Sequence, residues 1–402
     1  MRKEPFGLYV HIPFCSALCH YFDFAKTANY DSVRTEQYFS LLKKHLSEWK
    51  AVLKGRPKFT SVFFGGGTPG LFTSEYSELM ALILDMALPE AEITLEANLD
   101  NVTLDTVKLW RSLGFNRLSI GVQTFDHHGL KDLTRHHTRE KSLDAILLAA
   151  KYFPKSNGDL IYGWKDQTLE SWENDLNLIV DSGVGHISLY ALTYEGQTPF
   201  ARAEKRGVRK SMSDEGLAER YEVACQLLKG KGFIHDEISN WAKEGSSCDH
   251  NWLYWRGQHY LGIGAGAHGF LDDGSAIGLR YSYPSDFRTL LRGQGVPSAD
   301  GSEDSLANLI EAQGGSVDKS GDLDSWKLEY VGCGLRCKDG VNLNKLAAFG
   351  FKFQPNAKIK LAIEEGLLCD ERGQITLQVN EWFRETAWSY EICDSLTSSN
   401  KN

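Results

Sequence analysis

Long apolar runs are missing from this chain of 402 residues. No stretch approaches the roughly 18 consecutive apolar residues that a transmembrane helix needs. Residues 1–14, MRKEPFGLYVHIPF, carry basic residues but no long apolar core of the kind that a signal peptide has, so we expect a cytoplasmic protein. An excess of positive charge is also missing. The formal net charge is −9, which argues against nucleic acid as a partner.

Cysteines are few, and their number argues against a disulfide-stabilised scaffold. The chain has eight, of which four form two pairs with the same spacing, Cys15/Cys19 and Cys333/Cys337. In a cytosolic protein, such pairs are typical of metal ligands first and of small buried residues second.

The first 240 residues alternate short apolar runs with longer segments of helical periodicity. The predicted strands are 8–12, 60–64, 93–97, 118–122, 159–163 and 187–192, and the predicted helices are 33–53, 104–113, 142–152, 169–179 and 214–231. This α/β pattern indicates parallel strands joined by right-handed crossovers, in a barrel or in an open doubly wound sheet. Both architectures bind ligands at the carboxyl ends of their strands.

The composition changes after about residue 240, which predicts three parts. The first is the core, 1–240. The second, 241–325, is rich in Gly, Trp, Tyr and His and ends in a polar stretch, 296–325, that we interpret as a linker or surface insertion. The third, 326–402, is predicted to be a smaller, mostly helical domain with a hairpin near 366–379.

The loop after the first predicted strand carries the first cysteine pair. Residues 11–24, HIPFCSALCHYFDF, closely resemble the HIPFC-x3-C-x2-C pattern of radical S-adenosylmethionine (SAM) proteins of the oxygen-independent coproporphyrinogen oxidase and HemW group. In that family three thiolates hold a [4Fe–4S] cluster whose fourth iron binds SAM. The resemblance makes Cys15 and Cys19 metal ligands. The third position is Phe22, which cannot bind iron, so we expect the cluster to be weakened or lost.

Three explanations of Phe22 stay open. In the first, the fold persists without the cluster. In the second, another side chain replaces the missing cysteine, and His20 and Asp23 are the nearest candidates. In the third, a weak cluster is shared across a homodimer or completed by a distant cysteine. Cys333 and Cys337 are candidates for that completion. Their segment, however, resembles a C-terminal family stretch with apolar residues at both positions, so core packing is the favoured interpretation.

The second predicted strand ends in SVFFGGGTPG, residues 61–70, where glycines let the backbone approach a ligand closely. This segment resembles the family region that contacts SAM. The resemblance continues at ITLEAN (93–98), NRLSIGVQTF (116–125), LTRHH (133–137) and GDLIYG (158–163). It implies a SAM site formed by Tyr9, Tyr21, Gly66, Gly67, Thr68, Glu96, Gln123, Arg135 and Asp159. The family's LPGQT turn is here Trp164-Lys165-Asp166-Gln167-Thr168, which predicts an altered turn.

Residues 235–269 resemble the stretch that distinguishes the HemW group from true coproporphyrinogen oxidases. Phe24 also favours the HemW group, because true coproporphyrinogen oxidases have a cysteine at this position. In the HemW group the HNxxYW motif is associated with haem, and here it comprises His250, Asn251, Tyr254 and Trp255. Imidazole is a common axial ligand of haem iron, and aromatic rings cover porphyrin faces. The alternative is that His250 caps a turn and Trp255 packs in the core.

The resemblance implies a radical SAM partial (β/α)6 barrel with a winged-helix-like C-terminal domain. It favours a HemW-like chaperone that binds haem and delivers it to acceptor haem proteins, respiratory ones among them, with SAM and a doubtful [4Fe–4S] cluster as further cofactors. The alternatives are a radical oxidase of coproporphyrinogen III or a related tetrapyrrole, against which Phe22 argues, and an inactive paralogue. A homodimer and peripheral membrane contact are left open.

Overall fold

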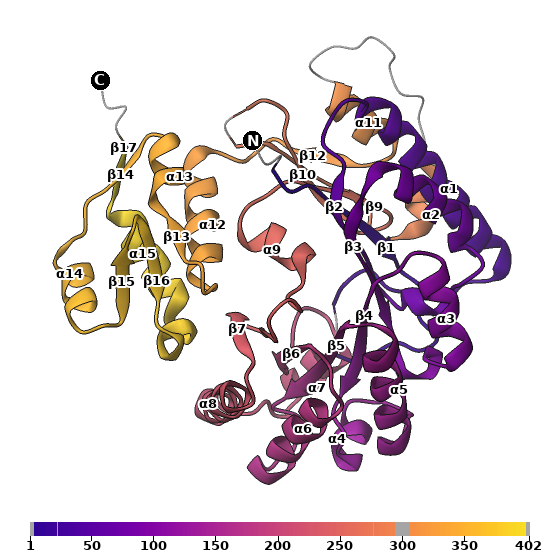
Figure 1. Ribbon diagram of the computed structural model, residues 1–402, viewed down its shortest axis with the longest axis horizontal. Helices are drawn as coiled ribbons and strands as arrows, with labels where there is room; N and C mark the ends of the chain where they lie inside the picture. The colour runs from indigo at the N-terminus through magenta and orange to yellow at the C-terminus, as the bar shows by residue number, and fades with distance from the viewer. Residues whose placement is uncertain (1–3, 22, 276, 294–304, 399–402) are drawn as a thin grey trace.

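The computed structural model describes residues 4–21, 23–275, 277–293 and 305–398. Its main feature is a twelve-stranded sheet with the order β12-β11-β10-β9-β1-β2-β3-β4-β5-β6-β8-β7 (Figure 1). The six central strands are β1 (Gly7–Ile12), β2 (Phe59–Gly66), β3 (Ala87–Ala97), β4 (Arg117–Gln123), β5 (Lys155–Tyr162) and β6 (His186–Ala191). They are parallel and lie side by side in sequence order. A doubly wound sheet reverses that order at one point, so the partial barrel is confirmed.

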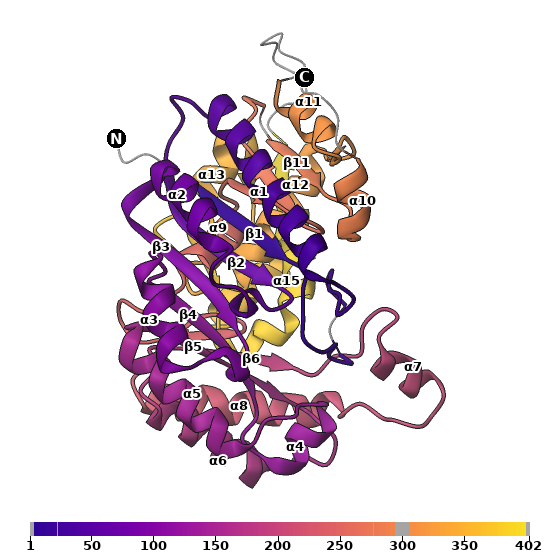
Figure 2. The ribbon, with the colours of Figure 1, turned by 90° about the vertical axis from the view of Figure 1, so that its right-hand side faces the viewer.

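Helices cover the outer side of this curved sheet (Figure 2). They are α1 (Ser32–Val52), α2 (Tyr76–Met86), α3 (Leu104–Ser112), α4 (His127–Asp132), α5 (Arg139–Tyr152), α6 (Leu169–Asp181) and α8 (Asp214–Gly230). Helix α7 (Pro199–Lys205) instead lies on a connection that projects away from the sheet (Figure 2). The five predicted helices are present as α1, α3, α5, α6 and α8. Their inner faces bury Trp49, Trp110 and Trp172 completely, and truncating such a side chain typically costs about 3–5 kcal/mol.

Short polar side chains fix where several of these helices begin. Asp31 accepts a hydrogen bond from the third backbone amide of α1, and Thr168 does the same for α6. Thr103 forms a reciprocal capping box with Thr106 at the start of α3. Each cap satisfies a backbone N–H that the helix itself leaves without a partner. The caps therefore fix where the loops that carry ligand residues end and where the helices begin.

The chain after α8 extends both edges of the sheet. One edge gains β7 (Ile234–Glu237) and β8 (Asn240–Ala242), and α9 (Asp249–Trp255) follows them. The other gains β9 (Tyr260–Ile263), which is parallel to β1, and then β10 (His268–Leu271), β11 (Leu279–Ser282) and β12 (Ser316–Asp318). Helix α10 (Phe287–Arg292) lies between β11 and the next described segment.

The interpretation of residues 296–325 as a linker is wrong for the middle part of this stretch. Residues 305–318 form α11 (Ser305–Ala312) and β12, and Leu306, Leu309 and Ile310 belong to the main hydrophobic core. Three apolar side chains at helical spacing are enough to anchor this otherwise polar segment. The part of the predicted linker at 296–304 lies outside the described residues.

The C-terminal region has its own hydrophobic core, which includes Trp326, Val341, Ile359 and Trp382. Its elements are α12 (Leu323–Leu335), β13 (Val341–Asn342), α13 (Leu343–Ala348), β14 (Phe351–Phe353), α14 (Ala357–Glu364), β15 (Leu368–Glu371), β16 (Gln374–Leu377), α15 (Glu385–Asp394) and β17 (Leu396–Ser398). Apart from β14, the element order α12-β13-α13-α14-β15-β16 and the sheet order β13-β16-β15 are those of a winged helix. The β15–β16 hairpin confirms the predicted one.

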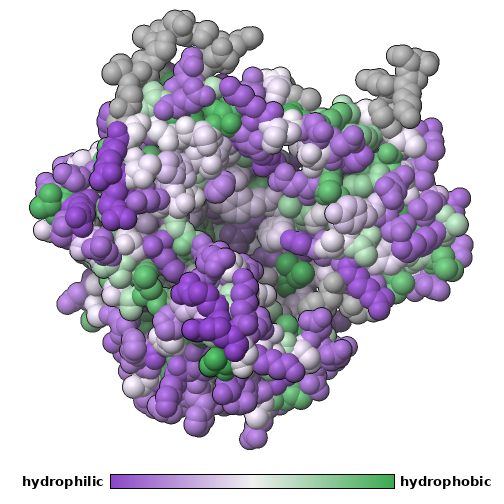
Figure 3. Space-filling view, turned by 180° about the vertical axis from the view of Figure 1, so that it is seen from behind, coloured by the Kyte–Doolittle hydropathy of each residue, from purple (hydrophilic) through white to green (hydrophobic). Residues whose placement is uncertain are grey.

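Seen from behind, the surface is largely hydrophilic with scattered apolar residues, and it is hollowed near its centre (Figure 3). None of the helices in the described ranges is long and apolar enough to cross a membrane.

Candidate functional site

A cavity of about 320 Å³ lies at the carboxyl ends of the central strands. It brings together both loop cysteines and most of the residues predicted for SAM. The predicted residues that line it are Tyr9, Cys15, Cys19, Gly66, Gly67, Thr68, Glu96, Gln123, Arg135 and Asp159. Tyr21 is buried beside the lining residues Cys19 and Arg135.

The glycines after β2 form a wall that has no room for side chains. Gly66 has φ 111°, and a Cβ there would lie 2.5 Å from the ring of His11. A Cβ on Gly67 would lie 2.6 Å from the carbonyl oxygen of Phe14. The amide of Gly66 donates a hydrogen bond to Glu96 Oε2 at 3.1 Å. The backbone therefore forms the cavity surface directly, as the glycine run predicts.

Two side chains in the cavity have polar atoms without protein partners. Gln123 is a non-glycine residue at φ 71°, beside a register shift between β4 and β5. Its Oε1 atom is buried and accepts no hydrogen bond, and the Nε atom of Arg135 is likewise buried without a partner. A strained backbone and unsatisfied buried polar atoms are features of ligand sites. Both side chains fit the carboxylate and hydroxyl groups of a molecule such as SAM.

Two carboxyl groups, those of Glu96 and Asp159, line the same cavity and repel each other when both are charged. Burial, reinforced by Asp159, raises the pKa of Glu96 to about 8. Burial also raises the pKa of Asp159 to about 6, although Asn157 donates a hydrogen bond to its Oδ1 at 2.7 Å. Carboxyl groups accept hydrogen bonds from ribose hydroxyls, so this pair suits the nucleoside part of such a ligand.

His11 and Lys26 also line this cavity, and sequence analysis missed both as site residues. His11 accepts a hydrogen bond from the Tyr9 hydroxyl at 3.0 Å and donates one from Nε2 to the Ala25 carbonyl at 2.8 Å. Burial lowers its pKa to about 4, so the ring is neutral and ties β1 to the end of the cysteine loop. The HIPF motif contains His11 and was the available signal.

The thiols do not make a complete cluster site. Cys15 is buried and hydrogen-bonded to Thr68, and burial raises the pKa of its thiol. Phe22 lies outside the described residues. Within the described ranges, no group of three or more His, Cys, Asp or Glu side chains is placed to hold a metal ion, so neither His20 nor Asp23 completes one. Two thiols do not fit a cluster that needs three protein ligands.

The second cysteine pair belongs to the C-terminal region. Cys337 is buried, and its thiol donates a hydrogen bond to the carbonyl of Cys333 at 3.2 Å. This geometry agrees with the favoured interpretation of core packing.

His250 lines a second, smaller cavity of about 220 Å³ that shares Tyr9, Glu96 and Asp159 with the first. Its Nδ1 lies 2.9 Å from Ser61 Oγ, and its Nε2 lies 2.9 Å from the Tyr254 hydroxyl. Burial lowers its pKa to about 3, so the neutral ring donates through one nitrogen and accepts through the other. Neither nitrogen is open to iron in this arrangement.

The other predicted haem residues divide between two places. Asn251 and Tyr254 line the same small cavity as His250. Trp255 is not among the residues that line it, and its side chain is instead hydrogen-bonded to Glu237. Three of the four named residues of the motif therefore lie around this small cavity.

The altered turn after β5 is closed by a residue in the left-handed region. Asp166 stands where the family has glycine, and it has φ 63°. The Gln167 amide donates to the Trp164 carbonyl at 3.1 Å, and Gln167 Oε1 accepts from the Gly163 amide at 2.7 Å. This turn therefore places a residue with a Cβ in a conformation that such residues disfavour.

The sequential parallel strands, with a cysteine loop after β1 and a glycine-walled cavity at the strand ends, define the radical SAM class. The Radical SAM superfamily model matches residues 9–179. The solved coproporphyrinogen III oxidase HemN of Escherichia coli, described as a radical SAM enzyme, has the same fold. Its TM-score is 0.73 at 20% identity, over 98% of this chain and 90% of that one.

Within that class the chain belongs to the HemW family. The heme chaperone HemW of Mycobacterium tuberculosis is 34% identical over 308 residues, which cover 74% of this chain and 77% of the relative. The heme chaperone HemW of Escherichia coli is 37% identical over 275 residues, which cover 67% and 71%.

Proposed function

We propose that this chain binds haem and delivers it to acceptor haem proteins, and that it does so without radical chemistry. The observation that carries this proposal is its relation to proteins named heme chaperone HemW over about three quarters of its length. The cluster loop supports the second half of the proposal, because Phe22 occupies the third ligand position. Reductive cleavage of SAM needs a cluster with an open iron, and two thiols do not supply it.

SAM itself fits the cavity better than the cluster does. In our proposal Gln123 and Arg135 bind its carboxylate and ribose oxygens, and Glu96 and Asp159 accept from its hydroxyls. The partnerless Gln123 Oε1 and Arg135 Nε support this role. SAM bound in this way orders the ends of β3, β4 and β5 without taking part in a reaction.

The intact cavity is also the observation that favours the alternative, a radical oxidase of a tetrapyrrole. The two functions differ in a product that can be measured. An oxidase releases 5′-deoxyadenosine from SAM in the presence of a reductant, whereas a carrier does not.

Haem transfer tests the proposal. The purified chain is titrated with haemin, and the complex is then mixed with apomyoglobin as the acceptor. We expect one haemin per chain and its transfer to apomyoglobin, faster than from an equal concentration of haemin-loaded serum albumin. Binding that fails to saturate at one haemin per chain would overturn the proposal.

A further inference from the structure

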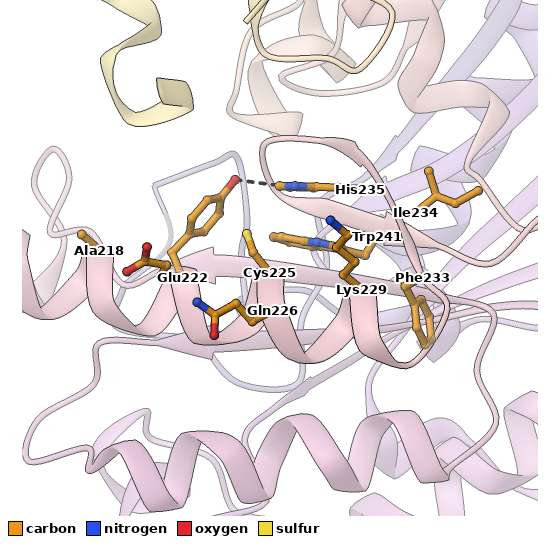
Figure 4. Close-up of a pocket in the computed structure, with 10 residues that line it drawn as sticks. Ala218, Glu222, Cys225, Gln226, Lys229, Phe233, Ile234, His235 and Trp241 are labelled. Atoms are coloured by element: carbon orange, nitrogen blue, oxygen red, sulfur yellow. Dashed lines mark hydrogen bonds between the residues drawn. The ribbon is translucent and has the colours of Figure 1, made fainter. Parts of the chain in front are cut away.

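A groove lies outside the barrel, between α8 and the edge strands β7 and β8. Its volume is about 690 Å³, three times that of the cavity around His250 and within the roughly 300–1,000 Å³ typical of small-molecule sites. Ten residues line it: Ala218, Tyr221, Glu222, Cys225, Gln226, Lys229, Phe233, Ile234, His235 and Trp241 (Figure 4).

One wall of the groove is flat and aromatic. The ring of His235 stacks on Trp241 with centroids 4.0 Å apart and an interplanar angle of 11°. Trp382 of the C-terminal region lies against His235 at 4.3 Å. The Tyr221 hydroxyl donates to the Ile238 carbonyl at 2.9 Å and lies 3.3 Å from His235 Nε2. These contacts hold the wall in place, and stacked rings favour a flat, largely apolar ligand.

The opposite wall carries a thiol. Cys225 is a free cysteine on α8, and Figure 4 shows its sulfur on the side of the helix that faces His235 and Trp241. It is half-buried and packs against the main core, and burial raises the pKa of its thiol to about 12, so iron has to displace the proton. Thiolate sulfur is an established axial ligand of haem iron.

Charge is distributed unevenly along the groove. Glu222 and Lys229 lie toward opposite ends of it in Figure 4. Near the Lys229 end, Lys243 Nζ lies 5.0 Å from the centroid of the Phe233 ring. Two ammonium groups at one end suit a ligand that carries carboxylates on one edge.

We propose that the α8–β7 groove is the haem seat of this chain, with Cys225 Sγ as an axial ligand and the haem carboxylates facing Lys229 and Lys243. This inference rests on the proposed function and adds the place where haem binds. When ferric haem binds, an iron–sulfur bond forms and the thiol proton leaves to solvent. The cavity at His250, about 220 Å³, is too small for this role, and both nitrogens of that ring already have partners.

Haemin titrations of the full chain and three variants test this assignment. Cys225→Ser keeps the volume of the groove and removes the iron ligand. We expect it to weaken haemin binding by roughly tenfold or more, because even the indirect partners of metal ligands cost this much when they are removed. We also expect loss of the thiolate-type Soret and electron paramagnetic resonance spectra. Lys229→Glu, on the exposed rim, should give a smaller loss without changing the spectra.

Cys369→Ser is the matched control, because Cys369 is a free cysteine on the β15–β16 hairpin, outside the groove. Its affinity and spectra should equal those of the wild type. If Cys225→Ser and Lys229→Glu both bind haemin as the wild type does, the groove is not the seat, although the carrier function stands. If the wild type binds no haemin, the function and its location fail together.

Discussion

The Nε2 atom of His250 lies 2.9 Å from the hydroxyl of Tyr254, and Nδ1 on the other side of the ring lies 2.9 Å from Ser61 Oγ. The imidazole therefore joins α9 to β2 inside the barrel. On the basis of these two contacts, we interpret His250 as a structural residue.

We predict that His250→Ala leaves haemin affinity within about twofold of the wild type and lowers the free energy of unfolding by about 2–4 kcal/mol. The loss combines a cavity with two buried hydroxyls that lose a partner. Urea denaturation and haemin titration measure the two effects, and the exposed His128→Ala is the control. A loss of haemin affinity with unchanged stability would instead make His250 an iron ligand.

Replacing Asp166 by glycine should stabilise the turn after β5. Asp166 has φ 63°, which glycine adopts without a steric penalty. We expect Asp166→Gly to raise the free energy of unfolding by up to about 1 kcal/mol, part of which is offset by the greater entropy of unfolded glycine. Lys165→Gly, one residue earlier, should destabilise the chain; equal effects of the two changes would refute this explanation.

Phe22→Cys supplies the thiol that the family pattern expects. After anaerobic reconstitution, we expect this variant to hold substantially more iron and acid-labile sulfide than the wild type, because three thiolates then match the ligand requirement of a site-differentiated [4Fe–4S] cluster. Phe22→Ser removes the same ring without adding a thiol and is the control. If both variants and the wild type take up equal iron, the missing cysteine is not what limits the cluster.

Glu96 makes the stability of the ligand-free chain depend on pH. Its pKa is about 8 in the folded chain against 4.5 for the free side chain, so the folded state holds the proton more tightly than the unfolded state does. Stability therefore falls as the pH rises from about 4.5 to about 8. Asp159, with a folded pKa of about 6, adds to the slope at its lower end.

Glu96→Gln should flatten that slope and make the chain more stable than the wild type at pH 8. The glutamine oxygen still accepts the hydrogen bond from the Gly66 amide, so the change removes charge and little else. Unfolding by urea at pH 5, 6.5 and 8 measures it, with the exposed Glu90→Gln as control. Parallel curves for wild type and Glu96→Gln would show that Glu96 is not the titrating group.

The grouping of the cavity residues could be predicted from the sequence, because these residues follow strands that periodicity identifies. Parallel strands bring their carboxyl ends to one edge, so Glu96, Gln123 and Asp159 meet once β3, β4 and β5 are placed. The motif also placed Asn251 and Tyr254 beside His250. What it did not reveal is that Ser61, 189 residues away in sequence, occupies one nitrogen of that ring.

Other features depend on packing that no local pattern records. The helix α2 is not among the predicted elements, although Leu79, Met80 and Ile83 are buried in the core. Helix α11 was not predicted, because polar residues surround its few apolar side chains in the sequence. The groove beside Cys225 exists only because β7 pairs with β8 at the edge of the sheet, opposite the face of α8 that carries the thiol.

The central claim is that this HemW-family chain carries haem without a complete iron–sulfur cluster. The most direct test is one anaerobic preparation, reconstituted with iron and sulfide, in which bound haemin, acid-labile sulfide and 5′-deoxyadenosine formed from SAM and a reductant are all measured. We expect one haemin per chain, sulfide well below the content of one [4Fe–4S] cluster, and no 5′-deoxyadenosine. A full cluster that cleaves SAM would contradict it.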